Sequence, residues 1–171
     1  MTDPDALRFC PCCGGGLETR NLKPGEPDRL ICTVCATPLY LDPKVVACAI
    51  VEAGDAVVLL RRGIQPQKGR WVMPGGFVDR GETVEAAALR ETREECGLRA
   101  RIKELLGVYS YPGETVVVVV YTAEHLSGDL FAGDETVEAR LVRPEEIPWE
   151  ELAFTSTRDA LTDYCQRRKS P

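Results

Sequence analysis

No apolar run in this sequence is long enough to cross a lipid bilayer. The longest runs, Val45 to Val51 and Val116 to Tyr121, each suit a single strand, whereas a membrane-spanning helix needs roughly 20 apolar residues. The opening residues, Met1 to Asp5, contain neither a basic stretch nor an apolar stretch, so no secretory signal is indicated. These absences predict a cytoplasmic protein without a membrane partner.

Positive charge is also in short supply. The 171 residues include 21 Lys and Arg against 27 Asp and Glu, which gives a net charge of −6. An acidic chain is not drawn nonspecifically to nucleic acid or to an anionic membrane, so neither is an expected partner. If this chain acts on phosphates, metal ions must bridge a protein and a substrate of like charge. The length suits one domain of ordinary size with a small accessory module.

Cysteine is abundant instead, and its placement is informative. Of eight cysteines, five lie between Cys10 and Cys35, where Cys10-x2-Cys13 and Cys32-x2-Cys35 are separated by eighteen residues. This spacing is typical of two zinc knuckles that close one tetrahedral all-cysteine site, and it predicts bound Zn²⁺. Two disulfides are the alternative, but they need an oxidising compartment that nothing in the sequence indicates. Cys12 can compete for a ligand role, although it is too near Cys13 to form a knuckle with it.

Residues 1–42 are therefore predicted to form a zinc ribbon in front of the main domain. They contain few apolar side chains, so their folding should depend on the metal. Through Asp42 they carry four basic residues against six acidic ones, without a basic stripe. We therefore expect a structural or docking role for the ribbon rather than DNA binding.

The chain becomes strand-like after Asp42-Pro43, and residues 43–171 are predicted to form the second domain. Strands are expected at Val45–Val51, Ala56–Leu60, 102–111, Glu114–Glu124 and Val137–Val142, and helices near Thr83–Glu95 and from the capping box Ser156-x-x-Asp159 to about Arg168. Five consecutive valines at 116–120 predict a central strand buried on both faces. Strands mixed with two or three helices indicate an α+β fold or an α/β/α sandwich.

A regular set of acidic residues lies between Gly76 and Leu98. The sequence there is Gly76-x5-Glu82-x7-Arg90-Glu91-Thr92-x-Glu94-Glu95-x-Gly97-Leu98. On a helix, Glu91, Glu94 and Glu95 fall at i, i+3 and i+4, within an arc of roughly 100°, so their charges repel. A hard cation such as Mg²⁺ or Mn²⁺ removes that repulsion and can bridge to phosphate. A solvated glutamate-rich face is the alternative, but it does not explain fixed spacings over 23 positions.

This pattern resembles the Nudix box, G-x5-E-x7-R-E-U-x-E-E-x-G-U, in which U is a bulky aliphatic residue. Only the first U position departs, where Thr92 would place a hydroxyl on the buried face. The resemblance implies a Nudix α/β/α sandwich with a mixed sheet, and hydrolysis of a pyrophosphate linkage in a nucleotide. It also implies a Mg²⁺ site formed by Glu94, Glu95, the Gly75 carbonyl and Glu91, with Glu91 as a ligand or as the general base.

The same resemblance assigns supporting roles. Arg90 would hold Glu91 through a charge-assisted contact, and Glu82 would support the loop that leads into the helix. Some members of the family use a loop glutamate as the base, for which Glu135 and Glu138 are the candidates. Nudix relatives are often dimers, which leaves a homodimer open.

The substrate must be chosen by residues outside the box. A zinc ribbon joined to a Nudix box is similar to the NADH pyrophosphatases, but Tyr109-Ser110-Tyr111-Pro112 stands where their S-Q-P-W-P-F-P signature would follow. The chain resembles more closely the ribbon-bearing Nudix proteins that include FAD pyrophosphatases also active on ADP-ribose. That likeness lies in Phe9-Cys10-x2-Cys13-Gly14-Gly15, Tyr40-x-Asp42-Pro43-Lys44, Ile64-Gln65-Pro66 and Leu152-Ala153-Phe154-x-Ser156.

We therefore expect a small-molecule substrate such as FAD or ADP-ribose, cleaved to AMP and a phosphorylated product. Phe77, Tyr109 and Tyr111 are candidates to stack on a base, with a place in the core as the alternative for each. Arg61 or Arg62 can reach a phosphate, unless both belong to a solvated loop. Two other functions stay open: an NADH or broad-range nucleotide or cap pyrophosphatase, and a nucleotide-sensing regulator without catalysis.

Overall fold

A computed structural model describes residues 7–169 of the chain, which form two compact units that divide between Asp42 and Pro43. The opening residues that lack a secretory signal lie outside the described part. Within residues 7–169, no helix is long and apolar enough to cross a membrane. Each unit is described by itself.

The smaller unit contains a three-stranded antiparallel sheet. Its strands are β1 (Leu17–Arg20), β2 (Arg29–Cys32) and β3 (Pro38–Leu39), with β2 in the middle. Among the described residues of this unit, only Cys10, Ile31 and Cys32 are buried. Three residues do not make a hydrophobic core, so the cysteines must contribute much of what holds this unit together.

The larger unit is built on a seven-stranded sheet. Five of its strands lie side by side in the order β10-β5-β4-β9-β8, and the two short strands β6 and β7 pair with β5 and β4. The strands are β4 (Lys44–Ala53), β5 (Ala56–Arg62), β6 (Trp71–Val72), β7 (Gly75–Phe77), β8 (Arg99–Tyr109), β9 (Val116–Ser127) and β10 (Thr136–Val142). Strands β4 and β9 pair in parallel and their other neighbours are antiparallel, so the sheet is mixed.

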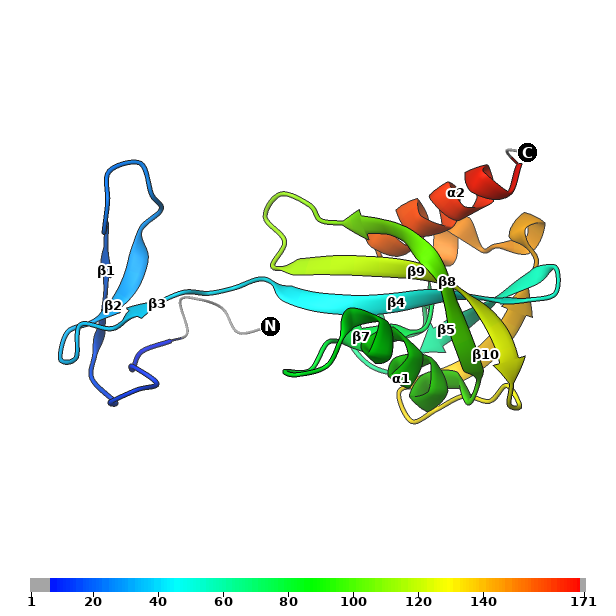
Figure 1. Ribbon diagram of the computed structural model, residues 1–171, viewed down its shortest axis with the longest axis horizontal. Coiled ribbons are helices and arrows are strands. Elements are labelled where there is room, and N and C mark those ends of the chain that lie inside the picture. The colour runs from blue at the N-terminus through cyan, green and yellow to red at the C-terminus, as the bar shows by residue number, and fades with distance from the viewer. Residues whose placement is uncertain (1–6, 170–171) are drawn as a thin grey trace. The chain divides into compact units, whose positions relative to one another are not determined.

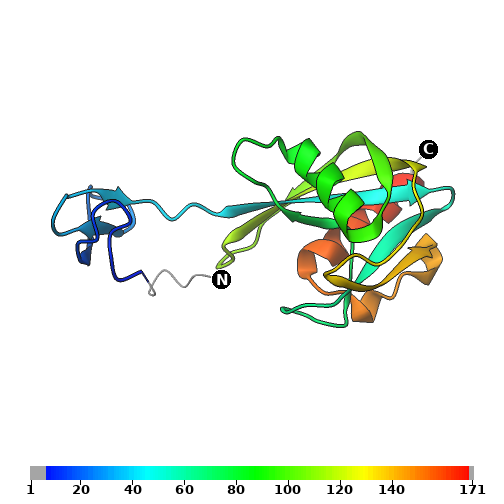
Figure 2. The ribbon, with the colours of Figure 1, turned by 90° about the horizontal axis from the view of Figure 1, so that it is seen from below.

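Helices α1 (Val84–Cys96) and α2 (Thr155–Lys169) cover opposite faces of this sheet (Figures 1 and 2). Two short 3-10 turns, Pro144–Glu146 and Trp149–Glu151, lead from β10 to α2. Alternate residues of β5 divide between two apolar clusters: Val58 and Leu60 pack with α1, whereas the residues on either side of Val58 pack with α2. The expected α+β sandwich with a mixed sheet is confirmed.

Two details of the expected elements are wrong. Strand β9 is interior, but only Val120–Ala123 are fully buried; Val116–Val119 are half-buried, because they pair with the start of β4, where Lys44 and Val45 are exposed. Helix α2 begins at Thr155, so Ser156 lies in its first turn instead of before it.

Candidate active site and metal centre

The four cysteines of the two C-x2-C pairs converge in the smaller unit. Their sulfur atoms all lie within 4.8 Å of one another, with 3.7 Å between the Sγ atoms of Cys10 and Cys35 and 3.4 Å between those of Cys13 and Cys32. Disulfide sulfurs lie ~2.05 Å apart, whereas four sulfurs at ~2.3 Å from a tetrahedral zinc lie roughly 3.8 Å from one another. The four cysteines are free, and their spacing fits a tetrahedral zinc site rather than a pair of disulfides.

Backbone N–H groups support the sulfurs, as in a knuckle. The N–H of Cys12 donates to the Cys10 sulfur at 3.4 Å, and the N–H groups of Val34 and Cys35 donate to the Cys32 sulfur at 3.4 Å. A hydrogen bond from the Thr37 hydroxyl lowers the pKa of Cys35 to about 6. The Cys12 side chain is exposed and stands outside the quartet.

In the larger unit, the acidic residues are carried by α1, whose ends are set by local sequence. The Thr83 side chain caps the start of the helix by accepting from the Ala86 N–H at 3.2 Å. Gly97 ends the helix with a positive φ of 75° and donates its N–H to the Arg93 carbonyl. Thr92 and Cys96 face the core, and the Thr92 hydroxyl finds its partner in the Ala88 carbonyl at 2.7 Å.

The two glycines of β7 let the backbone lie directly against the carboxylates of α1. The Gly75 N–H donates to Glu95 Oε2 at 2.8 Å. A methyl group on Gly76 would overlap the Glu91 carboxyl group, and one on Gly75 would lie 2.6 Å from the Ala47 carbonyl oxygen of β4. Glycine is therefore required at position 76 for Glu91 to approach this strand, and at position 75 for β7 to pair closely with β4.

Arg90 is hydrogen-bonded to three of the four glutamates of the acidic cluster, which consists of Glu82, Glu91, Glu94 and Glu95. Its guanidinium donates to both oxygens of Glu82 at 3.0 Å, to Glu91 at 2.7 Å, to Glu94 at 3.2 Å and to the Phe77 carbonyl at 3.1 Å. The hydrogen bonds from Arg90 lower the pKa of Glu82. These contacts lock the loop that precedes α1 onto the helix and hold Glu91 and Glu94 at its surface.

Glu95 is the acidic residue whose charge is least compensated. Burial raises the pKa of Glu95 to about 7, and the charges of Glu91 and Glu135 act in the same direction; the Gly75 N–H and the charge of Arg62 oppose them. A desolvated carboxylate beside other carboxylates fits a hard divalent cation, which would offset the charge of the group. The glutamates are less closely gathered than the cysteines, since Glu91 and Glu94 bind Arg90 while Glu95 binds Gly75.

The two candidate loop glutamates, Glu135 and Glu138, have different surroundings in the structure. The segment before β10 is attached to the end of α1, where the N–H groups of Phe131 and Gly133 donate to the carbonyls of Cys96 and Glu95 at 3.2 and 2.9 Å. Glu135, at the end of this segment, is near enough to influence Glu95. Glu138 instead forms ion pairs with Arg61, at 3.7 Å, and with Arg140. Gly133 is not distinguishable by sequence alone, where it is one glycine in a polar loop.

The structure does not bring Tyr109 and Tyr111 to the acidic cluster. Their hydroxyls donate to Asp163 and Asp159 of α2 at 2.9 and 2.6 Å, and Tyr109 packs against the apolar cluster under α2. Asp159, the expected capping residue, is thus used by Tyr111. Phe77, at the end of β7, is half exposed, and the Lys44 ammonium lies 4.9 Å from its ring centre.

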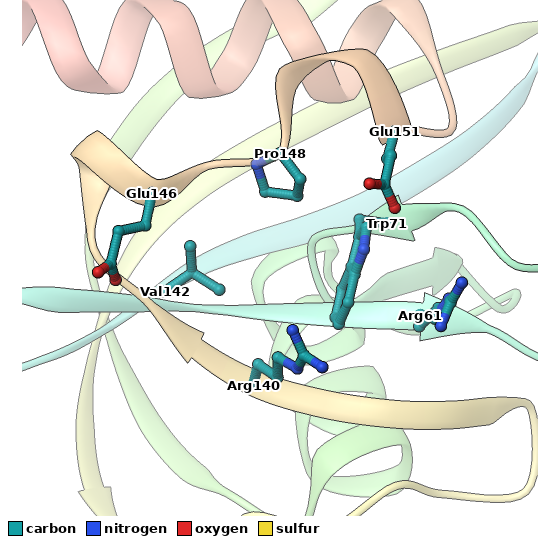
Figure 3. Close-up of a pocket in the computed structure, with 7 residues that line it drawn as sticks. All are labelled: Arg61, Trp71, Arg140, Val142, Glu146, Pro148 and Glu151. Atoms are coloured by element: carbon teal, nitrogen blue, oxygen red, sulfur yellow. The ribbon is translucent and has the colours of Figure 1, made fainter.

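A pocket of about 180 Å³ lies on the α2 side of the sheet (Figure 3). The guanidinium groups of Arg61 and Arg140 lie 6.0 and 5.2 Å from the centre of the Trp71 ring, and Glu146 and Glu151 also line the pocket. None of its lining residues belongs to the glutamate cluster, so this pocket is separate from the candidate metal site. Arg61, a candidate to bind phosphate, lines this pocket and pairs with Glu138.

A sequence profile of the family described as NUDIX domain matches residues 42–164. The chain belongs to this family. It is a Nudix hydrolase, in which residues 76–98 form the Nudix box. A NUDIX hydrolase from Nitrosomonas europaea has a similar crystal structure, with a TM-score of 0.90 and 39% identity over 95% of this chain and 92% of that one.

Two curated relatives carry more specific names. A protein of Methanocaldococcus jannaschii named ADP-ribose pyrophosphatase is 42% identical over 120 residues, which cover 68% of this chain and 70% of the relative. The NAD-capped RNA hydrolase NudC of Deinococcus radiodurans is 31% identical over 163 residues, 91% of this chain. The chain spans only 56% of the length of that NudC protein.

Proposed function

We propose that this Nudix hydrolase is a Mg²⁺-dependent enzyme that cleaves the diphosphate of ADP-ribose or a related dinucleotide to AMP and a phosphorylated product. The observation that carries the proposal is the placement of Glu91 and Glu95 against the two glycines of β7, at the end of a helix that also presents Glu94. This arrangement offers several carboxylate oxygens to a hard cation, which can bridge to a diphosphate.

Glu91, Glu94 and Glu95 would hold Mg²⁺ or Mn²⁺, and Cys10, Cys13, Cys32 and Cys35 would hold zinc. When bound, Mg²⁺ supplies positive charge that offsets the charge developing on the diphosphate, and it lowers the pKa of water. Arg90 keeps Glu91 and Glu94 on the helix surface, and the Gly75 N–H orients Glu95. The zinc would be structural, because four thiolates leave no position open for a substrate.

We further propose Glu135 as the general base, because it ends the loop segment whose Gly133 N–H donates to the Glu95 carbonyl at 2.9 Å. Glu135 would accept a proton from the attacking water, whereas Glu138 is engaged by two arginines. Glu135→Gln should lower kcat by at least ~10²-fold with little change in KM. Glu138→Gln is the matched comparison and should retain most of the activity; equal losses in both variants would remove the assignment.

The choice of substrate draws on the relatives and on sequence motifs. The relative named ADP-ribose pyrophosphatase supports ADP-ribose, and the ribbon and loop motifs support FAD. The match to NudC, which extends over most of this chain, favours an NAD-type dinucleotide as a second candidate. All three substrates share adenosine joined through a diphosphate. A cytoplasmic location and a homodimer remain predictions.

A hydrolysis assay with Mg²⁺ tests the proposal. The panel should contain ADP-ribose, FAD, NADH, NAD-capped RNA, dinucleoside polyphosphates and nucleoside triphosphates, with products identified by chromatography. ADP-ribose should give AMP and ribose 5-phosphate, and FAD should give AMP and FMN. A clear preference for a triphosphate would refute the dinucleotide assignment, and binding without turnover would instead support a nucleotide-sensing regulator.

A further inference from the structure

Two sequence segments outside the Nudix box meet at Arg62. The loop segment Ile64-Gln65-Pro66 lies on one side, where the Pro66 carbonyl accepts from Arg62 Nε at 2.8 Å. The segment Leu152-Ala153-Phe154 lies on the other, where the Arg62 guanidinium carbon is 5.1 Å from the centre of the Phe154 ring. The two segments are more than 80 residues apart in sequence, yet both hold the same side chain.

Backbone hydrogen bonds fix this meeting point. The N–H of Arg62 donates to the Arg70 carbonyl at 2.9 Å and the N–H of Gly69 donates to the Arg62 carbonyl at 2.8 Å, which close the loop between β5 and β6. The N–H of Ala153 donates to the Trp71 carbonyl at 2.8 Å, and this bond brings the next residue, Phe154, to the base of the loop. Arg62 is therefore held by main-chain geometry as well as by its own contacts.

The end of the Arg62 side chain is free to bind a ligand. Among residues 7–169, neither Nη atom of Arg62 makes a hydrogen bond or a close ion pair, whereas Arg61 donates to the Gly69 carbonyl at 2.8 Å and pairs with Glu138. In the sheet, Arg62 lies opposite Thr136, the residue after Glu135. The N–H of the next residue, Gly63, donates to the Glu135 carbonyl at 2.7 Å, and the N–H of Gly133 in the same segment donates to the Glu95 carbonyl at 2.9 Å. These bonds attach the Arg62 end of β5 to the end of α1 that carries Glu95.

We propose that Arg62 binds an oxygen of the substrate diphosphate, and that Phe154 is a positioning residue that holds the Arg62 guanidinium for this contact. The proposal rests on the proposed diphosphate hydrolysis and names the side chain that binds the diphosphate. A planar guanidinium suits a phosphate group geometrically, and a cation stacked on an aromatic ring loses less freedom when it binds. The aromatic face also attracts the cation directly.

Equilibrium binding of magnesium pyrophosphate, followed by calorimetry, tests the role of Arg62 without any choice of nucleotide. Arg62→Met should weaken binding about tenfold or more, the usual effect of losing a charge-assisted hydrogen bond. Arg61→Met is the discriminating comparison and Arg140→Met the matched control, and both should stay within about twofold of the native protein. If the Arg62→Met variant binds pyrophosphate as tightly as the native protein does, the proposal is overturned.

A double-mutant cycle tests the role of Phe154. Phe154→Leu should weaken pyrophosphate binding and raise KM for ADP-ribose severalfold, whereas Phe154→Tyr, which keeps the ring, should restore both. In the Arg62→Met background, Phe154→Leu should have no further effect, because Phe154 acts through Arg62. Additive losses would overturn the positioning role and indicate that Phe154 contacts the substrate itself.

The outcome also separates this proposal from the proposed function. If the native protein hydrolyses ADP-ribose while Arg62→Met matches Arg61→Met in KM and in pyrophosphate binding, the enzyme assignment stands and the Arg62 assignment fails. If Arg62→Met alone loses pyrophosphate binding while the native protein hydrolyses no dinucleotide in the panel, the Arg62 assignment stands and the proposed substrate class fails.

Discussion

The two units of this protein are stabilised in different ways. In the smaller unit, residues 7–42, which we call the ribbon unit, three described residues are buried, and the four free cysteine sulfurs lie within 4.8 Å of one another. The larger unit, residues 43–169, which we call the Nudix unit, has an apolar cluster on each face of its sheet. A ligand set can therefore be the centre of a fold, as in the ribbon, or a surface feature of a fold that stands without it, as in the Nudix unit.

The two candidate metal sites differ in the same sense. The sulfurs are positioned by knuckle backbones at spacings that suit a tetrahedral ion. The carboxylates are held by Arg90 and by Gly75, which leaves them to be regrouped by a cation. Soft, closed sites retain their ion, whereas hard, solvated sites exchange it.

The largest expected effect is on the ribbon. Cys32→Ser should abolish zinc binding and unfold residues 7–42, because a structural zinc site supplies on the order of 10 kcal/mol to a small domain. Native protein should contain about one zinc per chain by elemental analysis. Hydrogen exchange should show the Nudix unit still protected in the variant. Cys12→Ser is the control and should keep the zinc; a zinc-free native protein would refute the ribbon assignment.

Chelation should separate the two sites. Mild EDTA treatment should abolish hydrolysis before zinc leaves, and Mg²⁺ alone should restore it, because carboxylate-bound Mg²⁺ exchanges faster than thiolate-bound zinc. Activity and zinc content should be measured on the same samples over time. Simultaneous loss of both would contradict the division into a structural and a catalytic metal.

Within the Nudix box, Glu95→Gln should lower kcat by at least ~10²-fold, since it removes a ligand charge. The free energy of unfolding without metal should be unchanged or slightly higher, because an amide avoids the cost of burying a charge beside Glu91. Steady-state kinetics and urea denaturation measure the two effects. Glu114→Gln, an exposed change in the loop before β9, should leave both unaltered; near-native activity of Glu95→Gln would refute the metal site.

The smallest effect is expected at Thr92, the position that departs from the box pattern. Thr92→Val should stabilise the Nudix unit by up to about 1 kcal/mol, because the buried hydroxyl bonds only the Ala88 carbonyl, which the helix backbone also uses. Urea denaturation measures the change, and kcat should stay within about twofold. A loss of several kcal/mol would mean that the hydroxyl has a larger role in packing.

Much of the fold was predictable because strands and helices have different periods. The strand β5 follows from a short apolar run, and the helix α1 follows from the spacing of its glutamates. The half-buried start of β9 was not predictable, since five valines show apolar character but not which part of the strand the neighbouring layers cover. The capping box at Ser156 was misplaced: the helix begins one residue earlier, at Thr155, and Asp159 accepts a hydrogen bond from Tyr111.

Some residues of the candidate sites could likewise be predicted from the sequence, and others could not. Local spacing placed Glu91, Glu94 and Glu95 on one helix face, because they lie within about one helical turn. It also placed the four cysteines in two knuckles, because the two members of each pair are only three positions apart. Only the tertiary structure could separate Glu135 from Glu138 and Arg62 from Arg61. These residues are close in sequence, and what distinguishes them is the side of the sheet they face and the distant segments they meet.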